Sequence, residues 1–235
     1  MGRAFEFRKE RKMKRWSAMS KNFTRIGKDI VMAVKSGGAD PDSNSRLRAI
    51  MQNAKSINMP KDTVERAIKK ASSKDQEDYK EVVFEGYAPH GIAVLVETAT
   101  DNNTRTVANV RAAFSKCHGS MGTNGSVDFM FERKCHFKIG LENINVEELE
   151  FELIDFGAEE VFAEEDGVMI YAPFTEFGSI QKALEDKNIT VLSSGFERIP
   201  TLTKSLSPEH EIDVNKLIDR LEEEDDVQAV YTTMA

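Results

Sequence analysis

The fold is decided above all by residues 134–199, which read KCHFKIGLENINVEELEFELIDFGAEEVFAEEDGVMIYAPFTEFGSIQKALEDKNITVLSSGFERI. Alternating apolar residues predict strands, and apolar residues spaced by three and four predict helices. The order is strand 135–139, helix 146–155, strand 160–163, strand 168–171, helix 176–186 and strand 190–198. Asn145 and Glu148 form an expected cap of the first helix, and Gly157 its stop. This βαββαβ order predicts a ferredoxin-like unit.

The segments on either side of this stretch predict a second sheet. Strands are expected at 79–87 and 92–98, joined by the hairpin turn Ala88-Pro89-His90-Gly91, and a helix follows at 104–116. A loop, 119–125, then leads into a strand at 126–131. After Pro200 come a last helix and a strand at 227–232. Because a lone helix and strand need a sheet to join, we expect them to return to the 79–133 sheet.

The N-terminal third predicts three short amphipathic helices. Apolar residues at helical spacing run from Trp16 to Val34, and Gly37-Gly38 ends the first helix. Two further stripes run from Leu47 to Ile57 and, after Pro60, from Val64 to Ala71. None of the helices is long enough to be stable alone, so they are expected to form a small bundle. Residues 1–15 carry many charges and are read as a mobile or conditionally helical arm.

These elements predict an α+β protein of three domains. Residues 1–75 form the basic arm and three-helix bundle. Residues 76–133 and 200–235 form a discontinuous α/β domain, and residues 134–199 are the ferredoxin-like unit inserted into it.

Charge is divided sharply along the chain. Residues 1–74 hold 19 Lys and Arg against 7 Asp and Glu, a net of +12, whereas residues 75–235 hold 13 against 33, a net of −20. The two values sum to the total of −8. Such polarity favours a polyanionic partner over a small-molecule substrate. We therefore predict a nucleic acid, either ribosomal RNA or DNA, although basic runs are also common as solvated helix faces.

The predicted nucleic-acid contacts are long cations of the arm and bundle, together with one aromatic residue that is suited to base stacking. They are Arg8, Lys9, Arg11, Lys12, Lys14, Arg15, Trp16, Lys21, Arg25, Lys28, Arg46, Arg48, Lys61 and Arg66. Lys55, Lys69 and Lys70 are expected on the outer faces of the helices.

The sequence predicts a cytoplasmic protein without a membrane partner. No run of 18 apolar residues and no secretory signal is present, and Glu6 and Glu10 interrupt a transit-peptide pattern. Two cysteines are too few for a disulfide framework. Each precedes a histidine, Cys117-His118 and Cys135-His136, but adjacent residues on a strand point to opposite faces, so no metal site is expected.

No catalytic or cofactor motif is recognisable, so the sequence gives no support for an enzyme. The glycines Gly119, Gly122 and Gly125 follow a helix and precede a strand, the reverse of a phosphate-binding loop, and predict a long turn. Phosphate binding by their amides is a second interpretation.

Polar residues 98–106 are explained by capping at Asp101, Asn103 or Thr104. Arg105 is either functional or paired with a carboxylate. The acidic run 222–226 is interpreted as a solvated helix end.

Several motifs together resemble the YebC family of bacterial regulators, whose relatives include mitochondrial activators of cytochrome oxidase translation. They are Gly37–Asp42, Arg46–Arg48, Asn58–Asp62, Glu65–Lys70, Phe84–Tyr87, Thr100–Asn102, Arg105–Val107, Gly125–Val127, Phe131–Arg133, Asp226–Gln228 and Val230-Tyr231. The resemblance implies a helical N-terminal domain followed by two α/β domains, without enzyme activity. The family's His-Ser-Lys-Trp signature is replaced here by Met13-Lys14-Arg15-Trp16, and its glycine-rich hairpin turn by residues 88–91.

The resemblance implies two functions. One is a ribosome-associated translation factor that assists difficult stretches such as consecutive prolines, and the other is a DNA-binding transcriptional regulator. The first is favoured, because the basic end fits a concave RNA surface and helices two and three show no recognition-helix pattern. A third interpretation is an adaptor that joins proteins through the ferredoxin-like unit.

Overall fold

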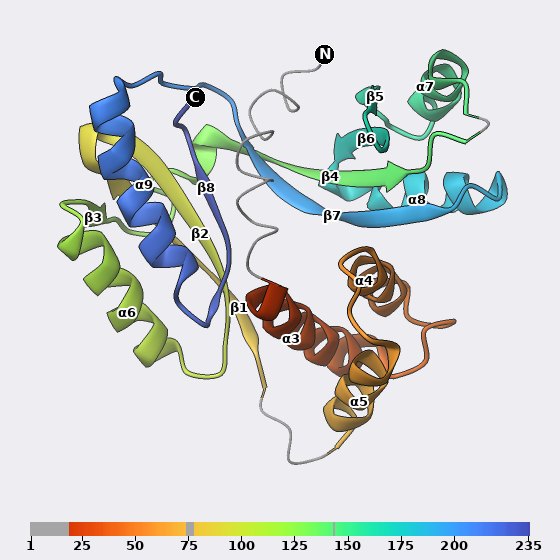
Figure 1. The fold of residues 1–235 in the computed structure, drawn as a ribbon, viewed down its shortest axis with the longest axis horizontal. Coiled ribbons are helices and arrows are strands. Elements are labelled where there is room, and N and C mark those ends of the chain that lie inside the picture. The colour runs from red at the N-terminus through yellow and green to blue at the C-terminus, as the bar shows by residue number, and fades with distance from the viewer. Residues whose placement is uncertain (1–18, 74–77, 143) are drawn as a thin grey trace.

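The computed structural model describes residues 19–73, 78–142 and 144–235. A helical bundle and two α/β units pack side by side (Figure 1). The predicted α+β class, with an N-terminal bundle and a ferredoxin-like unit, is confirmed. Among the described residues, no helix has both the length and the apolar character required to cross a membrane.

The bundle consists of α3 (Met19–Gly37), α4 (Ser45–Ser56) and α5 (Lys61–Ala71). Its core is built from the predicted stripes, with Ile30 and Leu47 fully buried. As predicted, α3 stops at the glycine pair, where Gly38 has a φ of +86°. The side chain of Asn44 then caps α4, since it accepts a hydrogen bond from the Leu47 amide. It also donates to the carbonyl of Ala33 in α3 and to that of Gly38 just after α3.

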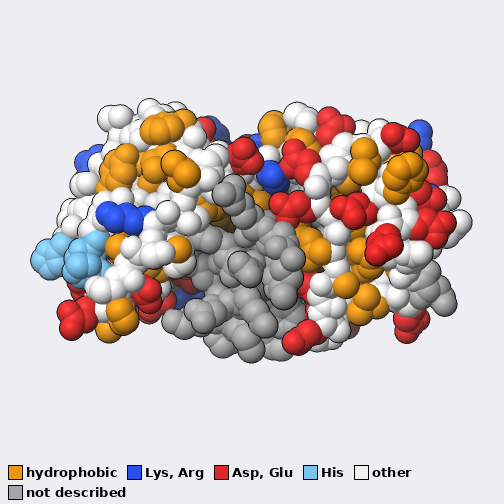
Figure 2. Space-filling model, turned by 90° about the horizontal axis from the view of Figure 1, so that it is seen from above, with side chains coloured by type: hydrophobic (Ala, Val, Ile, Leu, Met, Phe, Trp, Pro, Cys, Tyr) orange, Lys and Arg blue, Asp and Glu red, His pale blue; other side chains and the backbone are white. Residues whose placement is uncertain are grey.

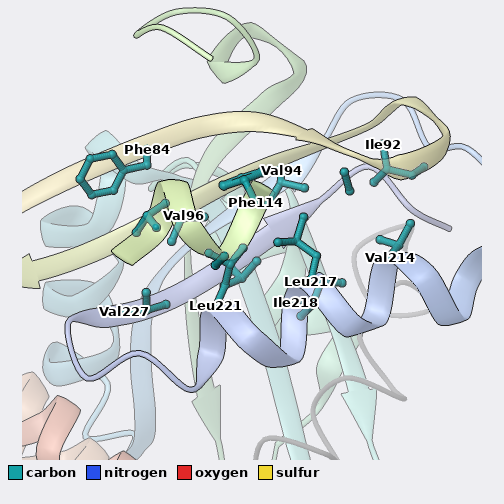
Figure 3. Packing of buried hydrophobic residues seen from close by; sticks show 14 of the residues in the cluster. Phe84, Ile92, Val94, Val96, Phe114, Val214, Leu217, Ile218, Leu221 and Val227 are labelled. Carbon is teal, nitrogen blue, oxygen red and sulfur yellow. The ribbon is translucent and has the colours of Figure 1, made fainter. Parts of the chain in front are cut away.

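The first α/β unit contains β1 (Lys80–Ala88), η1 (Pro89–Gly91), β2 (Ile92–Thr100), α6 (Asn103–Lys116), β3 (Ser120–Met121), α9 (Pro208–Glu222) and β8 (Val227–Thr232). Its sheet order is β3-β1-β2-β8. The last strand pairs antiparallel with β2, placing Val230 opposite Val96, so the C-terminal helix and strand return to this sheet. Figure 3 shows the core between the sheet and α9, with Val94 and Val96 facing Leu217 and Leu221.

Two local predictions in this unit were wrong. The strand expected at 126–131 is not formed, because Asp128–Met130 is a 3-10 turn, η2, and the next strand begins at Phe131. The loop expected at 119–125 contains the two-residue strand β3, which pairs with Gly86 and Tyr87. The pairing of β3 depends on contacts distant in sequence, which local apolar periodicity does not report.

The ferredoxin-like unit contains β4 (Phe131–Ile139), α7 (Val146–Ile154), β5 (Glu160–Glu164), β6 (Gly167–Pro173), η3 (Phe174–Glu176), α8 (Phe177–Asp186) and β7 (Val191–Pro200). The sheet is antiparallel in the order β5-β6-β4-β7. This is the split βαβ arrangement, and its core holds Phe137, Leu153, Ile170 and Leu184.

Two strands continue beyond the predicted limits of this unit. Phe131 of β4 pairs with Pro200 of β7, so both strands cross the junction between the two α/β units as a paired ribbon. We propose the division into residues 1–75, 76–133 with 200–235, and 134–199, with this ribbon as the connection between the last two.

Candidate nucleic-acid interface

The predicted contacts of the arm lie outside the described residues. These are Arg8, Lys9, Arg11, Lys12, Lys14, Arg15 and Trp16. The remaining seven predicted contacts belong to the bundle, and the structure separates them into internal and external cations.

Lys28 is an internal cation. It is 8% exposed, and its Nζ donates to the carbonyl oxygens of Ala99 at 3.0 Å and Asp225 at 2.8 Å and to Oδ1 of Asp226 at 2.7 Å. An ammonium group has three protons, so these partners use its donor capacity. We therefore leave Lys28 out of the proposed nucleic-acid contacts and assign it to the junction between the bundle and the first α/β unit.

Asp226 is the centre of this junction. Its Oδ2 accepts from Arg105 at 2.8 Å and from Thr106 Oγ1 at 2.7 Å, and it lies 3.3 Å from Thr100 Oγ1. Burial by itself would raise the pKa of the Asp226 carboxyl. The hydrogen bonds that Asp226 accepts outweigh burial, that from Lys28 having the largest effect among them, and lower the pKa to about 2. The interpretation of the acidic run as a solvated helix end is thus wrong for Asp226, which is 6% exposed.

Arg105 pairs with carboxylates, which explains it without a ligand. In addition to Asp226, its Nη2 contacts Oδ1 of Asp101 at 2.6 Å, and the two hydrogen bonds raise its pKa. The cap of α6 is Asn102, which accepts from the Arg105 amide, so the predicted caps at Asp101, Asn103 and Thr104 were wrong.

Arg25 also contributes to the junction. Its Nε donates to the carbonyl of Val227 at 3.1 Å and its Nη2 to that of Glu222 at 3.3 Å. Arg25 and Lys28, on successive turns of α3, therefore contact the end of α9, the start of β8 and the loop between them.

Arg46 and Arg48 lie on α4 and are engaged by carboxylates. Arg46 forms an ion pair with Glu81, and both side chains are about half exposed. Arg48 donates to the carbonyls of Pro41 and Asp42 and lies 3.5 Å from Glu185 of α8. These contacts use only part of the donor capacity of each guanidinium, which has five N–H donors.

The external cations lie on exposed faces of α3, α4 and α5. Lys21 and Lys61 are exposed, and the Lys61 side chain, 87% exposed, lies 3.5 Å from Glu65. Arg66 is exposed but donates to the Asp62 carbonyl and the Thr63 hydroxyl of its own helix. Lys55, Lys69 and Lys70 are also exposed. These three were expected on the outer faces but were not selected as contacts, although their helical spacing opposite the apolar stripe was a usable signal.

α4 is held on the edge of the ferredoxin-like sheet. The Asn53 side chain donates to the Ser194 carbonyl at 2.6 Å and accepts from the Ser194 amide at 2.8 Å. It thus pairs with the backbone of edge strand β7 as a neighbouring strand would. Of the bundle helices α4 and α5, only α4 is covered by this contact, and the outer face of α5 remains uncovered (Figure 1).

The glycine-rich loop is occupied by a carboxylate of the same chain. Glu85 accepts from the amides of Gly125 and Val127 at 2.6 Å each and of Asp128 at 2.8 Å. Burial opposes ionisation of Glu85, but the three amides outweigh it and hold its pKa below its usual value. The three glycine amides that were considered for phosphate binding are already paired. Those of Gly119 and Gly122 donate to the carbonyls of Phe114 and Glu85, and that of Gly125 donates to the Glu85 carboxylate.

The cysteines show no metal-binding geometry within the described part of the chain. Nowhere in residues 19–73, 78–142 and 144–235 do three His, Cys, Asp or Glu side chains converge as potential ligands. Cys135 is buried, its Sγ lies 3.3 Å from the Pro173 carbonyl, and burial raises the pKa of its thiol to about 11. A thiol held in this protonated state is a poor ligand and nucleophile.

Comparisons with known proteins agree with this architecture. Residues 3–74 match the family model described as the TACO1/YebC protein N-terminal domain, and residues 79–234 match that of the TACO1/YebC second and third domain. A probable transcriptional regulatory protein of Flavobacterium johnsoniae is 68% identical over 100% of this chain and 99% of its own length. One of Parabacteroides distasonis is 55% identical over 100% and 97%, respectively.

A solved structure shares the same arrangement. The conserved hypothetical protein Aq1575 from Aquifex aeolicus superposes with a TM-score of 0.78 at 36% identity, covering 93% of this chain and 90% of that chain. Two family models together match nearly all of the sequence, and near full-length relatives exceed half identity. The chain belongs to the TACO1/YebC family.

Proposed function

We propose that this chain is a non-enzymatic, cytoplasmic regulator of gene expression that binds nucleic acid through its helical bundle and basic arm. The observation that carries the proposal is the separation of charge between the bundle and the rest of the chain. Residues 1–74 have a net charge of +12, while residues 75–235 have −20. Polyanions are attracted to the first part and repelled by the second.

The preferred target is ribosomal RNA, which makes the chain a ribosome-associated translation factor that relieves stalling, for example at consecutive prolines. The external cations Lys61, Lys69 and Lys70 suit phosphate contacts, because lysine acts on phosphate as a point charge. Arg66, the residue on α5 best suited to reading guanine, is engaged by its own helix. Such a surface favours contacts with the nucleic-acid backbone over reading of a promoter sequence.

Placement of α4 gives a second argument against a promoter-reading mode. A helix-turn-helix protein inserts its second helix into the major groove. Here the Asn53 pairing with Ser194 holds α4 against β7, so α4 would have to undock before entering a groove. Binding of a concave RNA surface through the exposed helix α5 would require no such rearrangement.

The alternative is a DNA-binding transcriptional regulator, which is favoured by the names of the curated relatives, probable transcriptional regulatory proteins. Under this alternative the same external cations would contact DNA phosphates. The difference between the two functions then lies in the target and not in the surface.

The test is a competition at near-physiological salt between purified large ribosomal subunits and excess duplex DNA that includes promoter fragments. The test variants replace with serine either the six cations of the arm or the bundle cations Lys55, Lys61, Lys69 and Lys70. A matched control replaces four exposed cations of the α/β units: Lys80, Arg111, Lys116 and Lys182.

We expect the parent chain to bind the ribosomal subunits, both test variants to bind them more weakly, and the control variant to bind them as the parent does. The logarithm of the binding constant falls linearly with the logarithm of the salt concentration. Loss of four phosphate contacts should make this negative slope shallower by about 3. Sequence-dependent capture by particular DNA fragments would establish the alternative, and binding unaffected by either test variant would exclude both.

A further inference from the structure

Exposed apolar side chains are concentrated in the acidic ferredoxin-like unit. Of eleven large hydrophobic residues exposed among the described residues, seven belong to residues 134–199. Contiguous exposed apolar surface marks interaction sites more often than scattered residues do. Figure 2 shows hydrophobic and acidic side chains side by side over the lobe on the right, which is this unit. The seven residues are Leu141, Phe151, Ile154, Phe156, Phe174, Leu192 and Phe196.

The outer face of α7 carries the most exposed of these side chains. Phe151 is 78% exposed and Ile154 is 57% exposed, and their spacing of three places them together on one side of the helix. The helix is anchored by Leu149 and Leu153, which are 4% and 0% exposed on the opposite side. Core packing therefore accounts for the inner leucines and leaves the outer Phe151 and Ile154 unexplained.

Charge identifies the kind of partner. Residues 134–199 contain 15 Asp and Glu against 5 Lys and Arg, a net of −10. Glu147, Glu148, Glu150 and Asp155 are exposed around Phe151 and Ile154, and no ion pair involving them occurs among the described residues. A phosphodiester chain would be repelled by this surface, whereas Lys and Arg side chains of a protein would be attracted.

A second cluster lies beyond the end of α7. Gly157 packs against Glu176 of η3, and this turn also presents Phe174. The Arg133 guanidinium lies 5.0 Å from the ring centre of Phe174 and 5.2 Å from that of Phe196. Both distances are within the range of a cation–π contact, and the guanidinium has no hydrogen-bond partner among the described residues. Arginine flanked by aromatic residues is typical of the residues that dominate protein–protein binding energy.

We propose that the outer face of α7, defined by Glu147, Glu150, Phe151 and Ile154, docks on a Lys- and Arg-rich protein surface of the ribosome. The proposal rests on the proposed function, because it places this surface on the particle whose RNA the bundle binds. The apolar pair supplies buried area, and the glutamates supply charge complementarity. The ferredoxin-like unit thereby adds a protein contact to the RNA contact made by the bundle.

The test uses the full chain with p-benzoylphenylalanine in place of Phe151, bound to purified large ribosomal subunits and irradiated. The control carries the same photoreactive residue in place of Leu202, which is 75% exposed outside this unit. We expect a ribonuclease-resistant, protease-sensitive cross-link from position 151 and none from position 202. The reversal E147K/E150K should abolish the cross-link from position 151.

Affinity provides a second readout. The variant F151S/I154S should bind subunits at least about tenfold more weakly, which is typical of residues at the centre of an interface. The matched variant F129S/L202S removes two apolar side chains elsewhere that are 74% and 75% exposed, and it should bind normally.

The outcomes separate this proposal from the proposed function. A cross-link to RNA, or unchanged affinity of F151S/I154S while the parent chain still sediments with the subunits, would overturn the α7 docking alone. Failure of the parent chain to sediment with the subunits would overturn the ribosomal function, and the docking with it.

Discussion

Replacing Lys28 with methionine tests whether the junction around Asp226 holds the bundle on the first α/β unit. Methionine keeps the length of the side chain but removes the ammonium and its three hydrogen bonds. Asp226, which is 6% exposed in the parent chain, would keep Arg105, Thr106 and Thr100 as side-chain partners. We expect a loss of about 3 kcal/mol in the free energy of unfolding, near the lower end for breaking a buried ion pair, because those partners persist.

The assay is thermal and urea unfolding followed by circular dichroism. A loss of this size should lower Tm by about 6–12 °C in a chain of this length. The control is Lys21→Met, which removes an exposed lysine from the same helix and should change Tm little. Equal stability of the Lys28→Met variant and the parent chain would refute the assignment of Lys28 to the junction.

Acid provides an independent check of the same ion pair. The folded-state pKa of Asp226 is about 2, below the ordinary value of 3.8. Its contribution to stability is therefore complete above pH 3.8 and is lost as the pH falls through about 2. The difference in stability between the parent chain and the Lys28→Met variant should shrink across this window.

Three further substitutions test other parts of the structure. Asn53→Ala removes both hydrogen bonds to β7 and should lower the free energy of local opening by about 1–3 kcal/mol. The Ser194 amide should then exchange its hydrogen faster; unchanged exchange would show that α4 does not protect this edge. Glu85→Gln should lower the urea midpoint at pH 7, and because the folded pKa of Glu85 is depressed below 4.5, the difference from the parent chain should shrink as the pH falls below that value. Burial raises the pKa of Asp29 from 3.8 to about 7, so ionisation of Asp29 destabilises the fold as the pH rises through this range. Asp29→Asn should therefore raise the urea midpoint at pH 8, and an unchanged midpoint would contradict a destabilising charge at Asp29.

The sequence alone determined the order of the elements and the separation of charge. Local periodicity and capping place the helices and most strands, because these signals depend on neighbours a few residues apart. Asn145, for example, caps α7 as predicted, and the 134–199 pattern gives the ferredoxin-like strand order. The family resemblance was likewise readable from short motifs such as Gly37–Asp42.

The tertiary structure decided which charges face inward. Lys21 and Lys28 are alike in sequence, yet one is exposed and the other contacts Asp226, 198 residues away along the chain. The same holds for Glu85, whose carboxylate fixes the loop at 125–128 and replaces the expected strand with a turn. Burial of a charge is set by partners that only the folded chain brings together, so no local pattern distinguishes an internal cation from one available to a nucleic acid.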